Sequence, residues 1–127
     1  MSIPVELDAL DDALGTYGRQ AYLLSGGRDG RPHIAHVTLA WDGGRFTCGI
    51  GRSASANIEA CELVSLLWPP VTDGGYSMIV DAEAAAAGGT ATLVPTTGVL
   101  HRPAPAPDGA AADGDCAADC APISGSG

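Results

Sequence analysis

The sequence predicts a mainly β protein, built as a small antiparallel barrel of about six strands with a short N-terminal helix and one inserted helix. Runs rich in β-forming residues are separated by Gly-containing turns such as GGRDG and Gly88-Gly89, so most connections are expected to be hairpins. Closure into a barrel is favoured because it leaves no open sheet edge. With 127 residues, the chain is long enough for one domain with a core of its own.

The first half of the chain begins with a helical pattern and continues as strands. Apolar residues recur at helical spacing from Val5 to Leu14, with acidic residues between them, and Gly15 is expected to end this helix. Residues 21–25, 32–41 and 45–50 follow as strands of a meander, separated by Gly-rich turns.

The second half contains the inserted helix and the longest strand. Asn57 to Glu62 is predicted as the short helix, and Leu63 to Trp68 as a buried strand. Tyr76 to Ala87 is predicted as a long strand that turns at Gly88-Gly89 and returns from Thr90 to Val94.

Composition divides the chain in two. Residues 1–103 carry the strand and helix patterns, whereas residues 104–127 consist mostly of Pro, Ala, Gly, Ser and Asp and are expected to form a disordered tail. Cys116 and Cys120 have a CxxxC spacing, but no further Cys or His pair nearby completes a tetrahedral metal site. We therefore predict no metal.

The charge of the chain limits its partners. The formal net charge is −9. The sequence contains no lysine, so arginine supplies every positively charged side chain except histidine. Such a chain repels polyphosphate backbones, so nucleic acid is not expected as a partner. No apolar run is long enough to span a membrane and the N-terminus lacks a signal-peptide pattern, so we expect a cytoplasmic protein without a membrane partner.

The segment GRSASANIEACELVSLLW joins a Gly-rich loop to a short helix and a buried strand. Gly51 allows close backbone approach, Arg52 supplies charge, and Ser53 and Ser55 supply hydroxyls, which suits a phosphate group. Residues 49–54 also satisfy GxGxxA, but the predicted helix is too short for the crossover of a dinucleotide-binding fold.

The chain contains, in this order, PHIAHVTLAW, the segment from WDGGRFTCGIGRS to LLWPP, GYSMIVDAEA and VLHRPA. This order resembles that of the pyridoxamine 5′-phosphate oxidase-like split barrels, which bind flavin mononucleotide (FMN). The resemblance covers roughly residues 17 to 104. It implies a split β-barrel that forms a homodimer, with two cofactors in clefts between the subunits.

The resemblance also implies which residues hold the cofactor. The strand His36, Val37, Thr38 and Leu39 would lie along the isoalloxazine ring, and the phosphate would be held by a loop that contains Gly51, Arg52, Ser53, Ser55 and Asn57. Family members often carry an Arg-Lys pair in this loop, where the present chain has Ser53 and Ala54. No catalytic side chain is predicted, because the flavin itself transfers the hydride.

The sequence therefore favours an FMN-dependent oxidoreductase that acts on a small molecule. The alternative is a deazaflavin-binding protein or a cofactor-free dimeric binding module, and the missing Arg-Lys pair favours this alternative. A haem site with His36 or His101 as axial ligand is a third hypothesis. A metal site at His33 and His36 is not expected, because residues three apart on a strand point to opposite faces.

Overall fold

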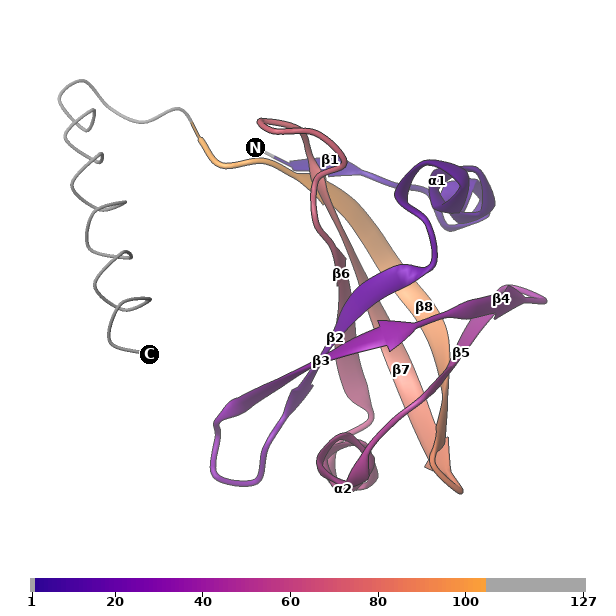
Figure 1. The fold of residues 1–127 in the computed structure, drawn as a ribbon, viewed down its shortest axis with the longest axis vertical. Helices are drawn as coiled ribbons and strands as arrows, with labels where there is room; N and C mark the ends of the chain where they lie inside the picture. The colour runs from indigo at the N-terminus through magenta and orange to yellow at the C-terminus, as the bar shows by residue number, and fades with distance from the viewer. Residues whose placement is uncertain (1, 105–127) are drawn as a thin grey trace, which may run out of the picture.

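The computed structural model describes residues 2–104, in which eight strands form one curled antiparallel sheet (Figure 1). The strands follow the order β3-β2-β6-β7-β8-β5-β4, and β1 pairs with the end of β8. The strands are β1 (Ser2–Pro4), β2 (Gln20–Gly26), β3 (Pro32–Thr38), β4 (Ala40–Asp42), β5 (Arg45–Gly49), β6 (Leu63–Trp68), β7 (Ser77–Ala87) and β8 (Thr90–His101). The predicted class, a mainly antiparallel split barrel, is confirmed.

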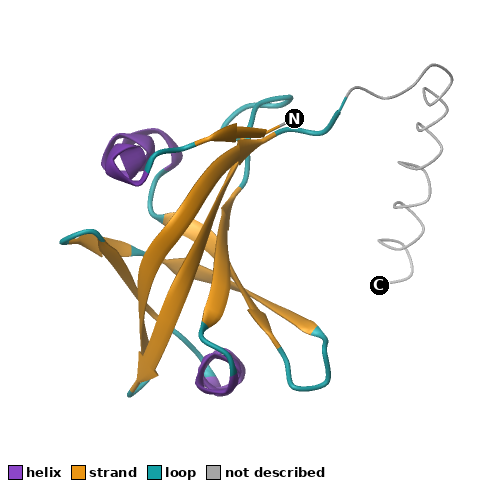
Figure 2. Cartoon of the chain, turned by 180° about the vertical axis from the view of Figure 1, so that it is seen from behind, coloured by secondary structure: helices purple, strands orange, loops and turns teal. Residues whose placement is uncertain are grey.

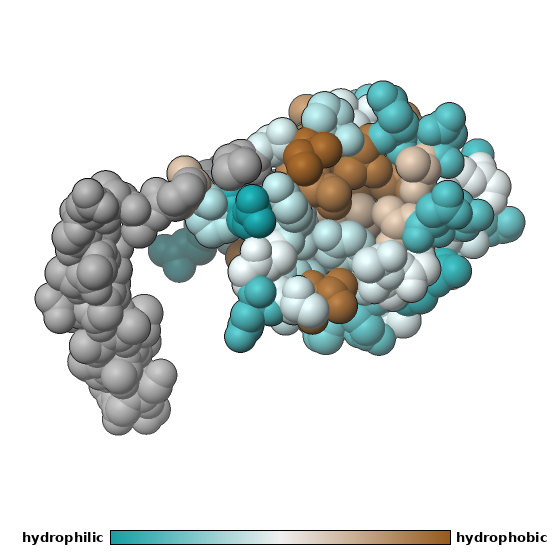
Figure 3. Space-filling model, turned by 90° about the horizontal axis from the view of Figure 1, so that it is seen from above, coloured by the Kyte–Doolittle hydropathy of each residue, from teal (hydrophilic) through white to brown (hydrophobic). Residues whose placement is uncertain are grey.

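Two helices close the ends of this curled sheet (Figure 2). A 3-10 turn, η1 (Leu7–Ala9), runs into α1 (Leu10–Tyr17) at the upper end, and α2 (Arg52–Ala60) lies at the lower end, where it contacts β7, β2 and β3. Among residues 2–104, no helix is both long and apolar enough to cross a membrane. Seen from above, the surface shows apolar patches beside hydrophilic residues (Figure 3).

The core fills the concave side of the sheet. Alternate residues of the strands point into it, as the burial pattern of β7 illustrates, and Phe46 and Trp68 are both fully buried at its centre. Their ring centroids lie 5.8 Å apart, and Trp41 packs on Phe46 from the short β4–β5 hairpin at 4.5 Å. The Trp68 indole N–H donates to the backbone oxygen of Gly18 at 3.0 Å, which ties the core to the end of α1.

The N-terminal helix differs from its predicted bounds. The residues from Val5 begin as an extended segment and a 3-10 turn, and the α-helix runs through Gly15 to Tyr17. It ends at Gly18, whose φ of 84° favours glycine. The helix continues because the Tyr17 hydroxyl donates to the backbone oxygen of Tyr76 at 2.8 Å, which anchors its last turn.

Two of the strands also differ from prediction. The strand expected over 32–41 is interrupted at Leu39, which is buried and whose N–H bonds to the backbone oxygen of Arg19 at 2.8 Å. The return strand expected over Thr90 to Val94 instead continues to His101. Pro95 does not end it, because it lies at a β-bulge, where a missing N–H costs no ladder bond.

The strand β1 was not predicted. It pairs with residues 99–101 of β8, so the N-terminus of the chain lies beside the last strand. The predicted tail falls almost wholly outside the described residues, as do Cys116 and Cys120.

Candidate functional site

The convex side of the sheet forms a second face, which we call the outer face. The strand register places one row of side chains together across five strands, namely His36, Tyr22, Leu67, Ile79 and Val99. The next row is formed by Ile34, Leu24, Ser65, Asp81 and Thr97. Most of these side chains are apolar, and Ile34 is 61% exposed. An apolar sheet face left open to water is typical of a surface that binds a partner.

The predicted phosphate loop is instead the beginning of helix α2. The helix starts at Arg52, five residues before the predicted start at Asn57, and Gly51 is its N-cap residue. Ala54 and Ile58 lie one helical turn apart and are both buried, so burial of this face favours the helix over a loop. The loop prediction was therefore wrong from Arg52 to Ala56, which are helical, whereas Asn57 is helical as predicted.

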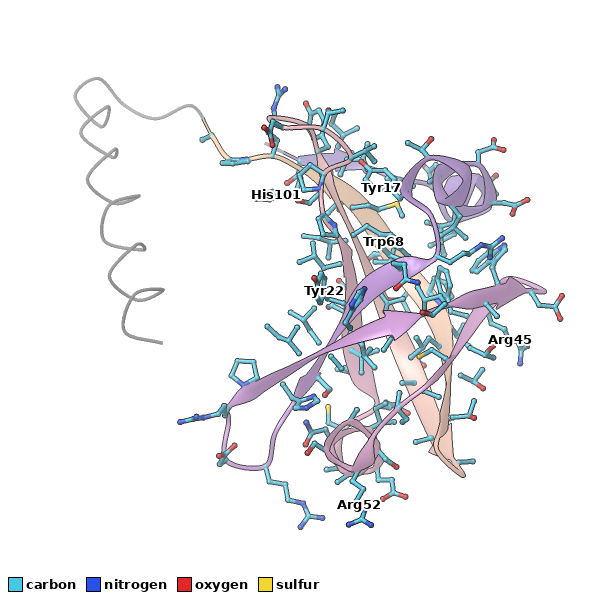
Figure 4. The ribbon with its side chains drawn as sticks, viewed as in Figure 1. Tyr17, Tyr22, Arg45, Arg52, Trp68 and His101 are labelled. Atoms are coloured by element: carbon cyan, nitrogen blue, oxygen red, sulfur yellow. The ribbon has the colours of Figure 1, made fainter. Side chains whose placement is uncertain are left out.

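A cavity of about 350 Å³ lies at the N-terminus of α2. Its lining includes Gly51, Arg52 and Ser55, together with Glu59 and Gly89. The first intrahelical bond is donated by the Ser55 N–H to the Gly51 oxygen at 3.0 Å, so the amides before it in the first turn have no intrahelical acceptor. Figure 4 shows Arg52 extending from the lower end of the molecule, away from the sheet. This arrangement can accept an anion through backbone N–H groups and one guanidinium.

Asn57 takes part in the fold rather than lining this cavity. Its Nδ2 donates to the Ser25 hydroxyl at 3.1 Å, and Ser25 is only 4% exposed. The cross-strand neighbour of Ser25 is His33, whose Nδ1 is buried and has no hydrogen-bond partner among the described residues. The Asn57 amide thus joins α2 to β2 and holds the helix against the sheet.

We expect Asn57→Ala to lower the free energy of unfolding by about 1–3 kcal/mol, because the buried Ser25 hydroxyl loses its donor. The measurement is urea denaturation followed by far-UV circular dichroism. Ser53→Ala is the matched control, since Ser53 is exposed on the same helix and its change should stay within about 0.5 kcal/mol. If both variants have the same urea midpoint, Asn57 does not hold α2 against the sheet.

The predicted ring-binding strand corresponds to β3 and the residue after it. His36 is exposed and stacks on Tyr22 with centroids 4.9 Å apart, and Thr38 accepts a hydrogen bond from Gln20 at 3.0 Å. Val37 and Leu39 are buried in the core. None of these four residues lines the cavity at α2. Within one chain, the predicted site residues therefore fall into two separate groups.

Other candidate chemistry is not assembled in the described chain. Residues 2–104 contain no group of three metal-ligating side chains. His36 lies on β3, and His101 ends β8 with its Nδ1 3.3 Å from the Ser2 hydroxyl, so either histidine of the haem hypothesis would act alone within one chain. Burial raises the pKa of the Cys48 thiol, which disfavours the reactive thiolate.

Sequence reasoning missed a polar group on the outer face. Asp81 accepts hydrogen bonds from Ser65 and Thr97, which belong to the strands on either side. The only signal in the sequence is an acidic residue in an apolar strand, and a solvated strand face explains that equally well.

Two uncharacterized proteins, from Mycobacterium bovis and Mycobacterium tuberculosis, are each 41% identical to the chain over 78 residues. The match covers 56% of the chain and 54% of each relative, so the chain spans about half the length of the curated relatives it matches. No protein-family model matches the sequence.

Solved structures share the fold at low sequence identity. A candidate pyridoxamine 5′-phosphate oxidase from Listeria innocua has a TM-score of 0.61 and 15% identity over 75% of this chain and 98% of its own. An FAD-binding protein from Mesorhizobium loti has a TM-score of 0.57 and 11% identity over 79% and 96%. An F420 reductase has a TM-score of 0.51 and 14% identity over 73% and 93%. The chain thus has the split-barrel fold of the pyridoxamine 5′-phosphate oxidase-like proteins.

Proposed function

We propose that the chain is a cytoplasmic oxidoreductase that binds a flavin-type cofactor, with FMN as the first candidate, and acts on a small molecule. The observation that supports this most directly is the cavity at the N-terminus of α2, which is lined by Arg52 and Ser55 and lies at the free backbone amides of the first helical turn. These groups fit a phosphate, because the positive end of the helix and the guanidinium both favour an anion. The fold neighbours named for FAD binding and F420 reduction add support by analogy.

We further propose that two copies pair through the outer face. Its apolar row, which includes Leu67 and Ile79, is suited to burial against an identical surface in a two-fold arrangement. The same pairing supports a shared site, because neither His36 nor Thr38 reaches the α2 cavity of its own chain. A site built from both groups then needs residues from two subunits.

The protein has few tasks in such a site. A bound flavin supplies the hydride-transfer chemistry. The residues of this chain bind and orient it: Arg52 and the α2 amides hold the phosphate, and the exposed edge of β3 around Thr38 offers polar groups. Apolar side chains of the outer face exclude water when two copies meet.

A deazaflavin is the second candidate, by analogy with the F420 reductase among the fold neighbours, and the cation content of the cavity limits how tightly FMN can bind. Among the described residues that line the cavity, Arg52 is the one arginine, and Glu59 places a carboxylate on the same wall. A site with one cation and one anion holds a phosphate more weakly than an Arg-Lys pair would. Affinity for FMN is then expected to depend strongly on Arg52.

We expect Arg52→Ala to weaken FMN binding about ten- to a hundredfold, because a charge-assisted hydrogen bond is lost. Fluorescence quenching during titration with FMN measures this, and a parallel titration uses a deazaflavin. Arg45→Ala is the control, since Arg45 is an exposed arginine of β5 that does not line the cavity.

The outcomes separate the candidates. FMN affinity that falls in Arg52→Ala and stays unchanged in Arg45→Ala supports the proposed site. Binding of the deazaflavin alone moves the assignment to that cofactor. If neither compound binds to the wild-type chain, the cofactor-free binding module replaces the oxidoreductase.

A further inference from the structure

Asp81 lies on the outer face, on β7, and is held by both neighbouring strands. The Ser65 hydroxyl donates to Oδ1 at 2.6 Å, and the Thr97 hydroxyl donates to Oδ2 at 3.1 Å. Each carboxylate oxygen therefore has one donor and keeps a further lone pair for a ligand. Both donors fix the carboxylate in one orientation, so it loses little freedom when it binds a third group.

The backbone at Asp81 is also irregular. The register of β7 on β8 shifts between Asp81 and Ala82, which leaves Thr96 as the extra residue of a β-bulge. The Thr96 hydroxyl donates to the backbone oxygen of Asp81 at 3.2 Å. Bulges occur next to binding sites because they redirect a side chain and end the regular pairing. Here the bulge adds a second hydroxyl from β8, which bonds the backbone oxygen of Asp81 and lines the same cavity as this residue.

A cavity of about 440 Å³ lies over this carboxylate. Leu24, Pro32 and Leu63 supply apolar walls, and Ser65, Asp81 and Thr96 supply the polar part of its lining. Among the described residues that line the cavity, none is a lysine or an arginine. The carboxylate thus faces an apolar hollow without a cation to neutralise it.

We propose that this cavity binds a small ligand with an apolar body and a cationic nitrogen, and that Asp81 holds the cation. The nitrogen donates to the two free acceptor positions of the carboxylate, while the apolar body contacts Leu24 and Leu63. The net charge of −9 favours approach of a cation and opposes an anion. This site lies apart from the cavity at α2, so its ligand binds without a flavin.

The proposal builds on the proposed function in one respect. If two copies pair through the outer face, the second copy covers this cavity and reduces its contact with water, which strengthens the attraction between Asp81 and the nitrogen. The ligand then lies between subunits as the cofactor does. Binding to a single chain is weaker but keeps the same selectivity for charge.

Benzylamine is the probe, and benzyl alcohol and benzoate are the neutral and anionic comparisons of similar shape. Binding to the full chain is measured by titration calorimetry at neutral pH. We expect benzylamine to bind at least about tenfold more tightly than benzyl alcohol and benzoate not to bind, because a charge-assisted hydrogen bond is involved. The same titrations are run on Asp81→Asn and on Glu83→Gln.

Glu83 is the matched control because it is an exposed carboxylate on the same face of β7, opposite Leu63, and does not line this cavity. Asp81→Asn should weaken benzylamine binding about tenfold or more, and Glu83→Gln less than about twofold. Should Asp81→Asn fail to fold, Ser65→Ala and Thr97→Val keep the charge and loosen its orientation, and each should weaken binding severalfold.

Two results would overturn the site. One is equal affinity for benzylamine and benzyl alcohol, and the other is equal benzylamine affinity in the wild type and Asp81→Asn. A change in dimer dissociation alone, seen by sedimentation, would also overturn it and assign Asp81 to contacts between copies. If the flavin proposal is wrong, the FMN titration shows it, and benzylamine binding remains intact. The two proposals can therefore fail separately.

Discussion

Replacement of Trp68 by alanine is expected to remove about 3–5 kcal/mol from the free energy of unfolding. The side chain is fully buried, packs on Phe46, and donates its indole N–H to Gly18 at 3.0 Å. The total stability of a domain is only about 5–15 kcal/mol, so most of it would be lost. Guanidinium denaturation followed by far-UV circular dichroism measures the change.

Trp41→Ala serves as the comparison. Trp41 is only partly buried and lies on the short β4–β5 hairpin, so its loss should cost no more than about 2 kcal/mol. Trp68→Phe separates the packing from the hydrogen bond, because it keeps an aromatic ring and leaves the Gly18 oxygen without this donor. Equal losses for Trp41→Ala and Trp68→Ala would show that the two tryptophans contribute alike to the core.

The second large effect is expected on the association of two copies of the chain. Leu67→Arg places a charge in the centre of the apolar row on the outer face, and a buried unpaired charge in a dimer interface costs several kcal/mol. We expect the dissociation constant of the dimer to rise at least about a hundredfold. The fold should persist, because Leu67 points away from the core. Sedimentation equilibrium and circular dichroism test the two statements together.

Thr16→Arg introduces the same charge on the exposed surface of α1 and should leave association unchanged. If Leu67→Arg remains a dimer, the copies meet elsewhere and the outer face has another partner. A wild-type chain that stays monomeric at micromolar concentration would contradict the proposed homodimer directly.

Local patterns in the sequence were enough to predict the hairpins but not the start of α2. Gly51, Ser53 and Ser55 are residues of the kind found in turns, so a loop was expected up to Asn57. The helix forms because Ala54 and Ile58 are buried by contacts with β2, β3 and β7. Those contacts come from segments distant in the sequence, and tertiary burial outweighs local propensity.

The same reasoning explains the missed strand and the misplaced strand end. Ser2 to Pro4 forms a strand only because it meets residues 99–101 at the other end of the domain. Pro95 is a reason to end a strand, yet the bulge places it where no ladder bond is needed. Neither feature has a local signature.

The candidate site was predictable in part. Glycine, arginine and serine in one segment identified Gly51, Arg52 and Ser55, which the structure brings to one cavity. The Asp81 site could not be predicted in this way, because Ser65 and Thr97 are each 16 residues from Asp81. Only the register of three strands brings them to one carboxylate.

The β7–β8 hairpin also bears on the order in which the chain folds. Its two turn residues, Gly88 and Gly89, have φ values of 59° and 80°, as the tight turns of twisted hairpins require. Closing such a small loop costs little chain entropy, so this ribbon can form early and supply a template. β5 then adds to one edge of it and β6 to the other. The N-terminal strand must close a loop almost as long as the domain, so it docks last and is the first to detach under stress.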